Sequence, residues 1–227
     1  MTEGFRRIGE GNTADIFLID DKKVLKLFKS GYSQDAVLKE YRNHCLVGEL
    51  TDSVPRVYDF MEADGRYGYS MENVKGVSLA SFMLRQQSFA QAMERFVRIH
   101  KDWLSMRCGR AVLYKDWMKN VLRGKAADKA LFDRIEGLPD GDILCHGDFH
   151  PYNILITEED RHVVIDFANI CRGPREYDIA RTYFLLKSAK ADMPVAEIYL
   201  EKMEIPYIDI QAYVETLAWF REYEMKT

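Results

Sequence analysis

The polar segment His146–Asn153 constrains this chain more than any other stretch of its sequence. It leads directly into the apolar run Ile154–Ile156. A second acidic residue, Asp166, lies 18 positions after Asp148 (148 to 166), at the end of the apolar run Val163–Ile165. Short apolar runs separated by polar turns predict strands. We therefore expect the segment to be a loop at the start of one short strand, with Asp166 at the end of the next.

The residue types in this loop indicate phosphoryl transfer from a nucleotide. His146 precedes Asp148 by two positions and Asn153 follows it by five. The reaction needs a carboxylate at the acceptor hydroxyl and oxygen ligands that hold magnesium on the phosphates, and protein kinases have the same Asp-to-Asn spacing. We predict Asp148 as catalytic base and Asn153 and Asp166 as magnesium ligands. We expect His146 to hydrogen-bond within the loop and stiffen it.

The bulk composition limits the other classes of function. A chain of 227 residues forms one large domain or two lobes. A formal net charge of −4 gives no electrostatic case for binding nucleic acid. No apolar run approaches the ~20 residues that cross a bilayer, and the first residues lack an apolar signal region, so we expect a cytoplasmic protein that does not enter the membrane. The four cysteines are scattered, which favours reduced, buried thiols over a metal site.

The first third of the chain is expected to be rich in strands, with one helix. Ser33 is a candidate N-cap for a helix at 35–50, in which apolar residues recur at helical spacing. Alternating apolar residues and polar turns predict five strands: Phe5–Gly9, Asp15–Ile19, Val24–Phe28, Val57–Met61 and Tyr67–Met71.

From Gly76 onward the pattern becomes helical. Apolar residues repeat along one face of a helix around Met93–Leu104. Trp117–Ile135 is expected to be one helix, and three more helices are predicted at Asp178–Lys187, Val195–Met203 and Ile210–Glu224. We place the join near residues 73–76, which gives an N-terminal nucleotide-binding lobe at 1–75 and a C-terminal helical lobe at 76–227.

A glycine-rich stretch and a lysine in the first lobe fit the same chemistry. Gly9–Ala14 lies between two predicted strands, which suits a flap over phosphates better than a dinucleotide-binding turn, since that turn would open a helix. Lys26 lies 15 positions past Gly11, between two leucines. On its own such a lysine is most often solvent-facing; with the flap before it, phosphate binding is favoured. It would then need a carboxylate partner, for which Glu40 is the first candidate and Glu49 the second.

The run from 142 to 186 resembles the aminoglycoside phosphotransferase family, a branch of the protein-kinase-like superfamily. The resemblance is carried by three motifs and extends to the glycine-rich stretch, Lys26 and the segment Met71–Gly76; the motifs are His146–Leu155, Ile165–Phe167 and Gly173–Ala180. It implies an α+β, bilobal protein-kinase-like fold. The small N-terminal lobe would hold an antiparallel sheet plus one helix, and the larger C-terminal lobe would be mainly helical.

The resemblance also implies ATP or GTP, with Mg²⁺, in the cleft between the lobes. Asp178 would brace the catalytic loop by accepting its backbone N–H groups. Tyr152 stands where the family usually has glycine, which adds bulk near the acceptor side. The residues implied to bind the nucleotide are Gly9, Gly11, Asn12, Thr13, Lys26, Glu40 and a hinge at Glu72–Val74, whose backbone would read the purine.

Three functions remain open at this point. A small-molecule kinase is favoured, because only nine positions separate Asp166 from Arg175, too few for a regulated activation loop. A compact protein kinase, or a nucleotide-binding module without turnover, is the alternative. We expect the acceptor to be a hydroxyl of an aminoglycoside, an amino-alcohol or a sugar-like molecule, and the sequence does not identify which. The three tryptophans could form an aromatic site for a quaternary amine, although core packing is the preferred interpretation.

Overall fold

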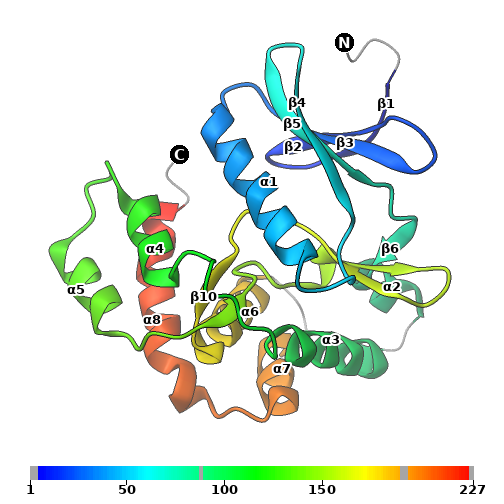
Figure 1. Cartoon of the computed structure of the whole chain (residues 1–227). Helices are drawn as coiled ribbons and strands as arrows, with labels where there is room; N and C mark the ends of the chain where they lie inside the picture. Colours follow the sequence, from blue (N-terminus) through cyan, green and yellow to red (C-terminus); the bar gives the residue numbers. More distant parts are fainter. Residues whose placement is uncertain (1–4, 87–88, 190–193, 225–227) are drawn as a thin grey trace. The chain divides into compact units, whose positions relative to one another are not determined.

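The computed structural model describes residues 5–86, 89–189 and 194–224 (Figure 1). The chain divides into two compact units. The first unit is Met1–Ser78 with Ile154–Ala168, and the second is Leu79–Asn153 with Asn169–Thr227. The first unit is mainly strand and the second mainly helix, so the expected α+β class is confirmed.

The first unit is built on a five-stranded antiparallel sheet with strand order β1-β2-β3-β5-β4. One helix, α1 (Gln34–Gly48), contacts β4 and β5, and the Ser33 hydroxyl accepts the Ala36 N–H at its start (3.3 Å), as predicted. The strands are β1 (Arg6–Glu10), β2 (Ala14–Leu18), β3 (Lys23–Phe28), β4 (Val57–Ala63) and β5 (Arg66–Glu72).

Both faces of this sheet are covered by apolar side chains. Leu25, Leu27 and Ala63 form one buried cluster, whereas Tyr69 belongs to a second cluster with Val37 of α1. Full burial of each of these leucines contributes about 1.5–3 kcal/mol. The central strand β3 is therefore packed on both sides, and this burial surrounds Lys26.

A second, three-stranded sheet completes the first unit. Its order is β6-β8-β9, with β6 at Gly76–Ser78, β8 at Ile154–Thr157 and β9 at His162–Val164. A Cβ at Gly76 would lie 2.6 Å from the Ile156 carbonyl oxygen, so this close strand pairing needs glycine. The pairing assigns 76–78 and 154–168 to the first unit, a division that differs from the expected boundary between 75 and 76.

The second unit is helical, with one small sheet of β7 (Ile143–Cys145) and β10 (Cys171–Gly173). Helix α6 contacts both α7 and α8. The helices are α2 (Leu79–Gln86), α3 (Phe89–Trp103), α4 (Tyr114–Leu122), α5 (Lys129–Gly137), α6 (Arg175–Ser188), α7 (Val195–Met203) and α8 (Tyr207–Glu224), with a short 3₁₀ turn, η1, at Pro151–Asn153. Most of these helices were expected; α2, β6, β7 and β10 were not.

Helix α3 confirms the predicted apolar face, since Met93, Phe96, Val97 and His100 are all buried. The single helix predicted over 117–135 is wrong, because the structure has α4 and α5 with residues 123–128 between them. Gly124 adopts φ = +78° in this connection. That conformation interrupts a right-handed helix and is accessible to glycine without a Cβ penalty.

Core packing accounts for two of the three tryptophans. Trp103 and Trp117 are each 3% exposed, and Trp219 is half-buried. Cys108, Cys145 and Cys171 are buried free thiols, in line with the predicted packing role. Across the described ranges, no helix is long and apolar enough to cross a membrane.

Candidate functional site

The loop between β7 and β8 presents alternate side chains on opposite sides. His146, Phe149, Pro151 and Asn153 are buried, whereas Asp148, His150 and Tyr152 retain exposure. Its end is fixed by η1, where the Asn153 N–H donates to the His150 carbonyl (2.9 Å). Packing holds the start, because the Phe149 ring stacks on His100 of α3 with 4.1 Å between centroids. The loop is therefore rigidly anchored, with one side open.

Asp178, in the first turn of α6, anchors the loop backbone. Its Oδ2 accepts the His146 N–H (3.0 Å) and its Oδ1 accepts the Gly147 N–H (2.8 Å), the bracing role that the resemblance implied. Burial alone would raise the pKa of Asp178, but His100 and the Gly147 N–H lower it below its ordinary value. Tyr199 can donate to His100 Nδ1 (2.7 Å), which leaves His100 Nε2 to donate to Asp178 (3.2 Å).

Gly147 meets a steric requirement of the loop. Its φ is +75°, and a Cβ would lie 2.6 Å from the Asn169 carbonyl oxygen. Its own carbonyl accepts from Nε of Arg181 (2.7 Å), a buried side chain that is paired with Glu224 (2.6 Å). Glycine and a buried cation together orient the peptide that precedes Asp148.

Asp148 is the acidic group that this loop displays. Its side chain is 26% exposed. Asn153 Nδ2 donates to the Asp148 carbonyl (3.0 Å) and to its Oδ2 (3.2 Å), and His150 Nε2 lies 3.5 Å from the same Oδ2. Burial would raise the pKa of Asp148, but His150 and His146 lower it below the ordinary value. The carboxylate is therefore ionised at neutral pH and able to accept a proton.

His146 cannot contact a substrate, because it is fully buried. Its Nδ1 accepts the Asp148 N–H (3.2 Å). His146 is thus a positioning residue, consistent with the loop-stiffening role expected for it.

In the first unit, Lys26, Glu40 and Asp166 form a charged cluster. Lys26 Nζ lies 2.5 Å from Glu40 Oε1 and 3.4 Å from Asp166 Oδ1. Tyr69 donates to the same Glu40 oxygen (2.9 Å). Burial alone would lower the pKa of Lys26, but the charges of Glu40 and Asp166 raise it above its ordinary value. Glu40 is therefore the partner of Lys26, and Glu49, the second candidate, lies exposed beyond the end of α1.

Lys26 is 8% exposed, which excludes the solvent-facing alternative. The Lys26 side chain lies on the face of β3 opposite to Leu25 and Leu27. This face is covered by α1. A lysine ammonium in such a position is held by counter-charges and keeps its proton. It can offer positive charge to a phosphate.

Asp166 has a strained backbone, with φ = +71°. A non-glycine residue in this region costs about 1–3 kcal/mol, and such residues cluster at functional sites. The following residue holds it in place: the Phe167 carbonyl accepts from Asn43 Nδ2 (2.8 Å), and the Phe167 ring lies 4.6 Å from that of His44. The Asp166 side chain is 40% exposed, so its free oxygen is accessible from outside the unit.

The two predicted magnesium ligands, Asn153 in the second unit and Asp166 in the first, each offer an oxygen of the kind that magnesium binds. Asn153 directs Nδ2 at Asp148, and no described residue hydrogen-bonds to its Oδ1, so an amide oxygen is available. Asp166 supplies a carboxylate. Magnesium takes one or two protein oxygens and completes its shell with water and phosphate. Within the described ranges no cluster of three or more His, Cys, Asp or Glu side chains could hold a metal by itself.

The glycine-rich stretch forms the turn between β1 and β2. Gly11 N–H donates to the Ala14 carbonyl (2.8 Å), and residues 11–13, which include Asn12 and Thr13, are exposed. A strand follows, as predicted, and this excludes the dinucleotide-binding alternative. Gly9 lies next to a register shift in the β1–β2 pairing. The exposed backbone of this turn can approach a phosphate.

Only part of the backbone of the predicted hinge, Glu72–Val74, is available to a ligand. Glu72 N–H donates to the Arg56 carbonyl (2.7 Å) and Asn73 N–H to the Lys22 carbonyl (2.8 Å), so both are occupied. The Val74 N–H has no partner among the described residues. A cavity of about 220 Å³ in the first unit is lined by this segment and by the turn between β8 and β9.

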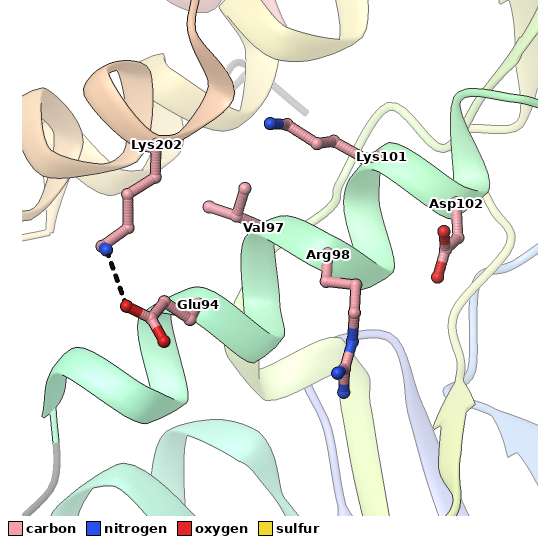
Figure 2. A pocket seen from close by; sticks show the side chains of 6 residues that line it. All are labelled: Glu94, Val97, Arg98, Lys101, Asp102 and Lys202. Atoms are coloured by element: carbon pink, nitrogen blue, oxygen red, sulfur yellow. Dashed lines mark hydrogen bonds and ion pairs between the residues drawn. The ribbon is translucent and has the colours of Figure 1, made fainter.

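A larger hollow, about 390 Å³, lies in the second unit away from every predicted site residue (Figure 2). It is lined by α3 residues and by Lys202 of α7. Lys202 pairs with Glu94 (3.1 Å) and Lys101 with Glu204 (2.8 Å), and Figure 2 shows Arg98 directed away from both lysines. The two lysines of this hollow are paired with glutamates and Arg98 points away from them, so we assign the hollow no part in the chemistry.

Three supporting residues were not found by sequence reasoning. His100 is buried, and its partner is Asp178, 78 positions away. Arg181 and Thr182 hold the carbonyls of Gly147 (2.7 Å) and Phe149 (3.0 Å). Their position one turn after Asp178 on α6 was the available signal, since residues three and four apart share a helix face.

Comparisons with known proteins agree with this geometry. A model of the phosphotransferase enzyme family matches residues 4–202. A thermostable mutant of aminoglycoside phosphotransferase APH(4)-Ia, in a ternary complex with ADP and hygromycin B, is similar in structure with TM-score 0.69 and 15% identity, over 97% of this chain and 85% of that one. Choline kinase LicA from Streptococcus pneumoniae has TM-score 0.61 and 13% identity, over 99% and 87%.

A third similar structure, aminoglycoside-3'-phosphotransferase of type VIII, has TM-score 0.61 and 16% identity, over 97% of this chain and 93% of that one. At sequence identities this low, the structural similarity establishes a shared fold and nothing further. A comparison with curated protein sequences finds no match. Because the family model spans most of the sequence, the chain belongs to the phosphotransferase enzyme family, and the expected enzyme class of phosphotransferase is confirmed.

Proposed function

We propose that this enzyme transfers the γ-phosphoryl group of ATP or GTP, with Mg²⁺, to a hydroxyl of a small molecule such as an aminoglycoside, an amino-alcohol or a sugar. The observation that carries the proposal is the Asp148 carboxylate. It is ionised, partly exposed, and fixed on a loop whose backbone is held by a buried second carboxylate, Asp178. A carboxylate held this way is suited to receive the proton of an acceptor hydroxyl.

In the proposed reaction the acceptor oxygen forms a bond to the γ-phosphorus as the bond from that phosphorus to the β–γ bridging oxygen breaks. Its proton passes to Oδ of Asp148, and the nucleoside diphosphate leaves with the bond's electron pair. The preorganised loop keeps the carboxylate in place without rearrangement, which is the main protein contribution to such transfers.

The first unit would supply the phosphate-binding groups. Lys26, with its proton secured by Glu40 and Asp166, would offer charge to the nucleotide phosphates. The turn at Gly9, Gly11, Asn12 and Thr13 would cover them with backbone N–H groups, and the backbone of Glu72 and Val74 would contact the purine. Asp166 of this unit and Asn153 of the second unit would each offer an oxygen to Mg²⁺, which when bound neutralises charge on the phosphate oxygens.

A small-molecule acceptor is supported by the short segment after Asp166. The chain passes from Asp166 through β10 to the start of α6 at Arg175. This leaves no length for the regulated loop on which a protein kinase depends. One of the similar structures is a complex with hygromycin B and another is a choline kinase. Both molecules are small and carry hydroxyl groups, which favours the same class of acceptor here.

Nucleotide binding is tested by thermal unfolding with ATP or GTP, each with and without MgCl₂. A ligand that binds only the folded state at 100 times its Kd stabilises it by about 2.7 kcal/mol, so we expect a rise in Tm of several degrees that needs both components. No shift with either nucleotide would contradict the proposal.

Transfer is tested by following diphosphate release over a panel of hydroxyl-bearing metabolites and aminoglycosides, with Asp148→Asn as blank. We expect at least one small acceptor to be phosphorylated. Phosphorylation of a generic protein substrate with no transfer to small molecules would favour the compact protein kinase instead.

A further inference from the structure

Three side chains form the open side of the catalytic loop: Asp148, His150 and Tyr152. The first two are each 26% exposed in their side chains, whereas Tyr152 is 64% exposed. An isolated exposed tyrosine needs no explanation. Tyr152 differs from such a residue because it lies on a loop whose other neighbouring side chains, including Pro151 and Asn153, are buried.

The backbone beneath Tyr152 is fixed. Pro151 restricts its own φ, and the Asn153 N–H to His150 carbonyl bond (2.9 Å) closes the 3₁₀ turn around Tyr152. The Tyr152 ring lies 6.1 Å from the His150 ring at 71°, an edge-to-face contact. His150 in turn directs Nε2 at Asp148 Oδ2 (3.5 Å). The carboxylate, the imidazole and the phenol thus form a continuous row.

We propose that Tyr152 is an acceptor-binding residue whose ring face supports the part of the acceptor next to the phosphorylated hydroxyl. This rests on the proposed function, in which that hydroxyl lies at Asp148. An acceptor larger than the hydroxyl must extend over the neighbouring exposed groups. His150 is turned inward to Asp148 and Asn153, so the Tyr152 ring is the outermost surface that such an acceptor meets.

The ring face determines the chemistry of the acceptor. Aromatic faces carry negative electrostatic potential and attract ammonium groups and the polarised C–H groups of sugars. In the described part of the chain the lysines and arginines that lie over aromatic rings are at other rings, so the Tyr152 face is unoccupied by a cation. The neighbouring Asp148 carboxylate adds negative charge. The acceptor is therefore neutral or cationic at this position, and an acidic acceptor is disfavoured.

The experiment compares Tyr152→Phe, which keeps the ring, with Tyr152→Leu, which keeps apolar bulk but removes the π face. Tyr207→Leu is the matched control, because Tyr207 is an exposed tyrosine (42%) at the start of α8. The panel contains amino sugars, amino-alcohols and their quaternary forms, neutral sugars, and acidic polyols such as glycerate. Steady-state kcat and KM are measured for each phosphorylated acceptor and for the nucleotide.

We expect Tyr152→Leu to raise the acceptor KM about tenfold, and Tyr152→Phe and Tyr207→Leu to leave it within about twofold. The nucleotide KM should be unchanged in all three. An unchanged acceptor KM in Tyr152→Leu overturns the proposal, as does a wild-type enzyme that phosphorylates only the acidic polyols or no panel member. Failure of the proposed function appears separately, as absence of Mg²⁺-dependent stabilisation by nucleotide.

Discussion

The two units hold their carboxylates in different ways. In the first, Glu40 and Asp166 are opposed by the ammonium of Lys26, so the cluster is an ion-pair network. In the second, Asp178 is held by two backbone N–H groups and a histidine, and it fixes Asp148 only through the loop between them. The first arrangement keeps a cation that can bind phosphate. The second holds the Asp148 carboxylate beside Asn153 and His150, where it stays ionised and able to take a proton.

The difference is one of charge balance. Removing one partner of a buried ion pair is strongly destabilising, because it leaves the other charge buried and unpaired. Peptide N–H groups carry partial charge and cannot be lost by ionisation, so the Asp178 anchor tolerates changes in charge around it better than the Lys26 cluster does. Substitutions in the two units should therefore separate binding from chemistry.

The largest expected effect separates Asp148 from Asp166. Asp148→Asn removes the proton acceptor and should lower kcat about a thousandfold, with nucleotide affinity nearly unchanged. Asp166→Asn removes charge from the proposed metal site and should weaken Mg²⁺-dependent nucleotide binding. Kinetics and isothermal titration with Mg·ATP measure the two effects, and circular dichroism checks the fold. Equal loss of nucleotide binding in both variants would contradict the assignment of proton transfer to Asp148 and metal binding to Asp166.

The next effect concerns the backbone anchor of the second unit. Asp178→Leu leaves the N–H groups of His146 and Gly147 without their acceptor and should lower the free energy of unfolding by about 3 kcal/mol. Urea unfolding measures this. Asp133→Leu, at an exposed position on α5, is the control and should change stability by less than about 0.5 kcal/mol. Similar values for both variants would mean that the loop is held by packing alone.

The sequence predicted features that depend on local periodicity or on dense motifs. Helices α1 and α3 followed from the spacing of apolar residues, and the Asp178 anchor followed from a motif that the family resemblance supplied. Features that depend on contacts distant in sequence were missed. Strand β6 exists because it pairs with β8, 77 to 81 positions further along the chain. His100 supports the loop from 78 positions before Asp178.

Lys26 illustrates the same limit. Its place between Leu25 and Leu27 is compatible with a solvent-facing or a buried side chain, since alternation fixes the face but not what covers it. The covering helix α1, with Glu40 directed at the ammonium, is a tertiary feature. The break at Gly124 was missed for a local reason, because one glycine inside a helical pattern is often tolerated.

A smaller effect tests the charge balance of the first unit through pH. His44 is buried against Phe167 and Tyr69, and burial together with the nearby Lys26 charge lowers its pKa from 6.5 to about 4. The folded pKa is depressed, so this histidine contributes stability above pH 6.5 that is lost as pH falls towards 4. The loss is about 2–3 kcal/mol by pH 4.5.

His44→Gln can keep the donor to the Pro55 carbonyl (2.7 Å in the wild type) but does not titrate. Urea unfolding of both proteins at pH 7 and pH 4.5 isolates the histidine, because all other titrating groups are shared. We expect the wild type to lose more stability than the variant between the two pH values. Parallel losses would show that a second positive charge is tolerated beside Lys26.

The smallest effect compares the helices that carry the two anchoring carboxylates. Helix α1, which carries Glu40, begins with a side-chain cap from Ser33, whereas α6, which carries Asp178, begins at Pro174 without one. Ser33→Ala should cost about 1 kcal/mol, because the Ala36 N–H loses its acceptor. Ser30→Ala, at an exposed position just upstream, is the matched control. If the two alanine variants unfold at the same urea concentration, the register of α1, and with it the position of Glu40, is set by packing against β4 and β5 and not by the cap.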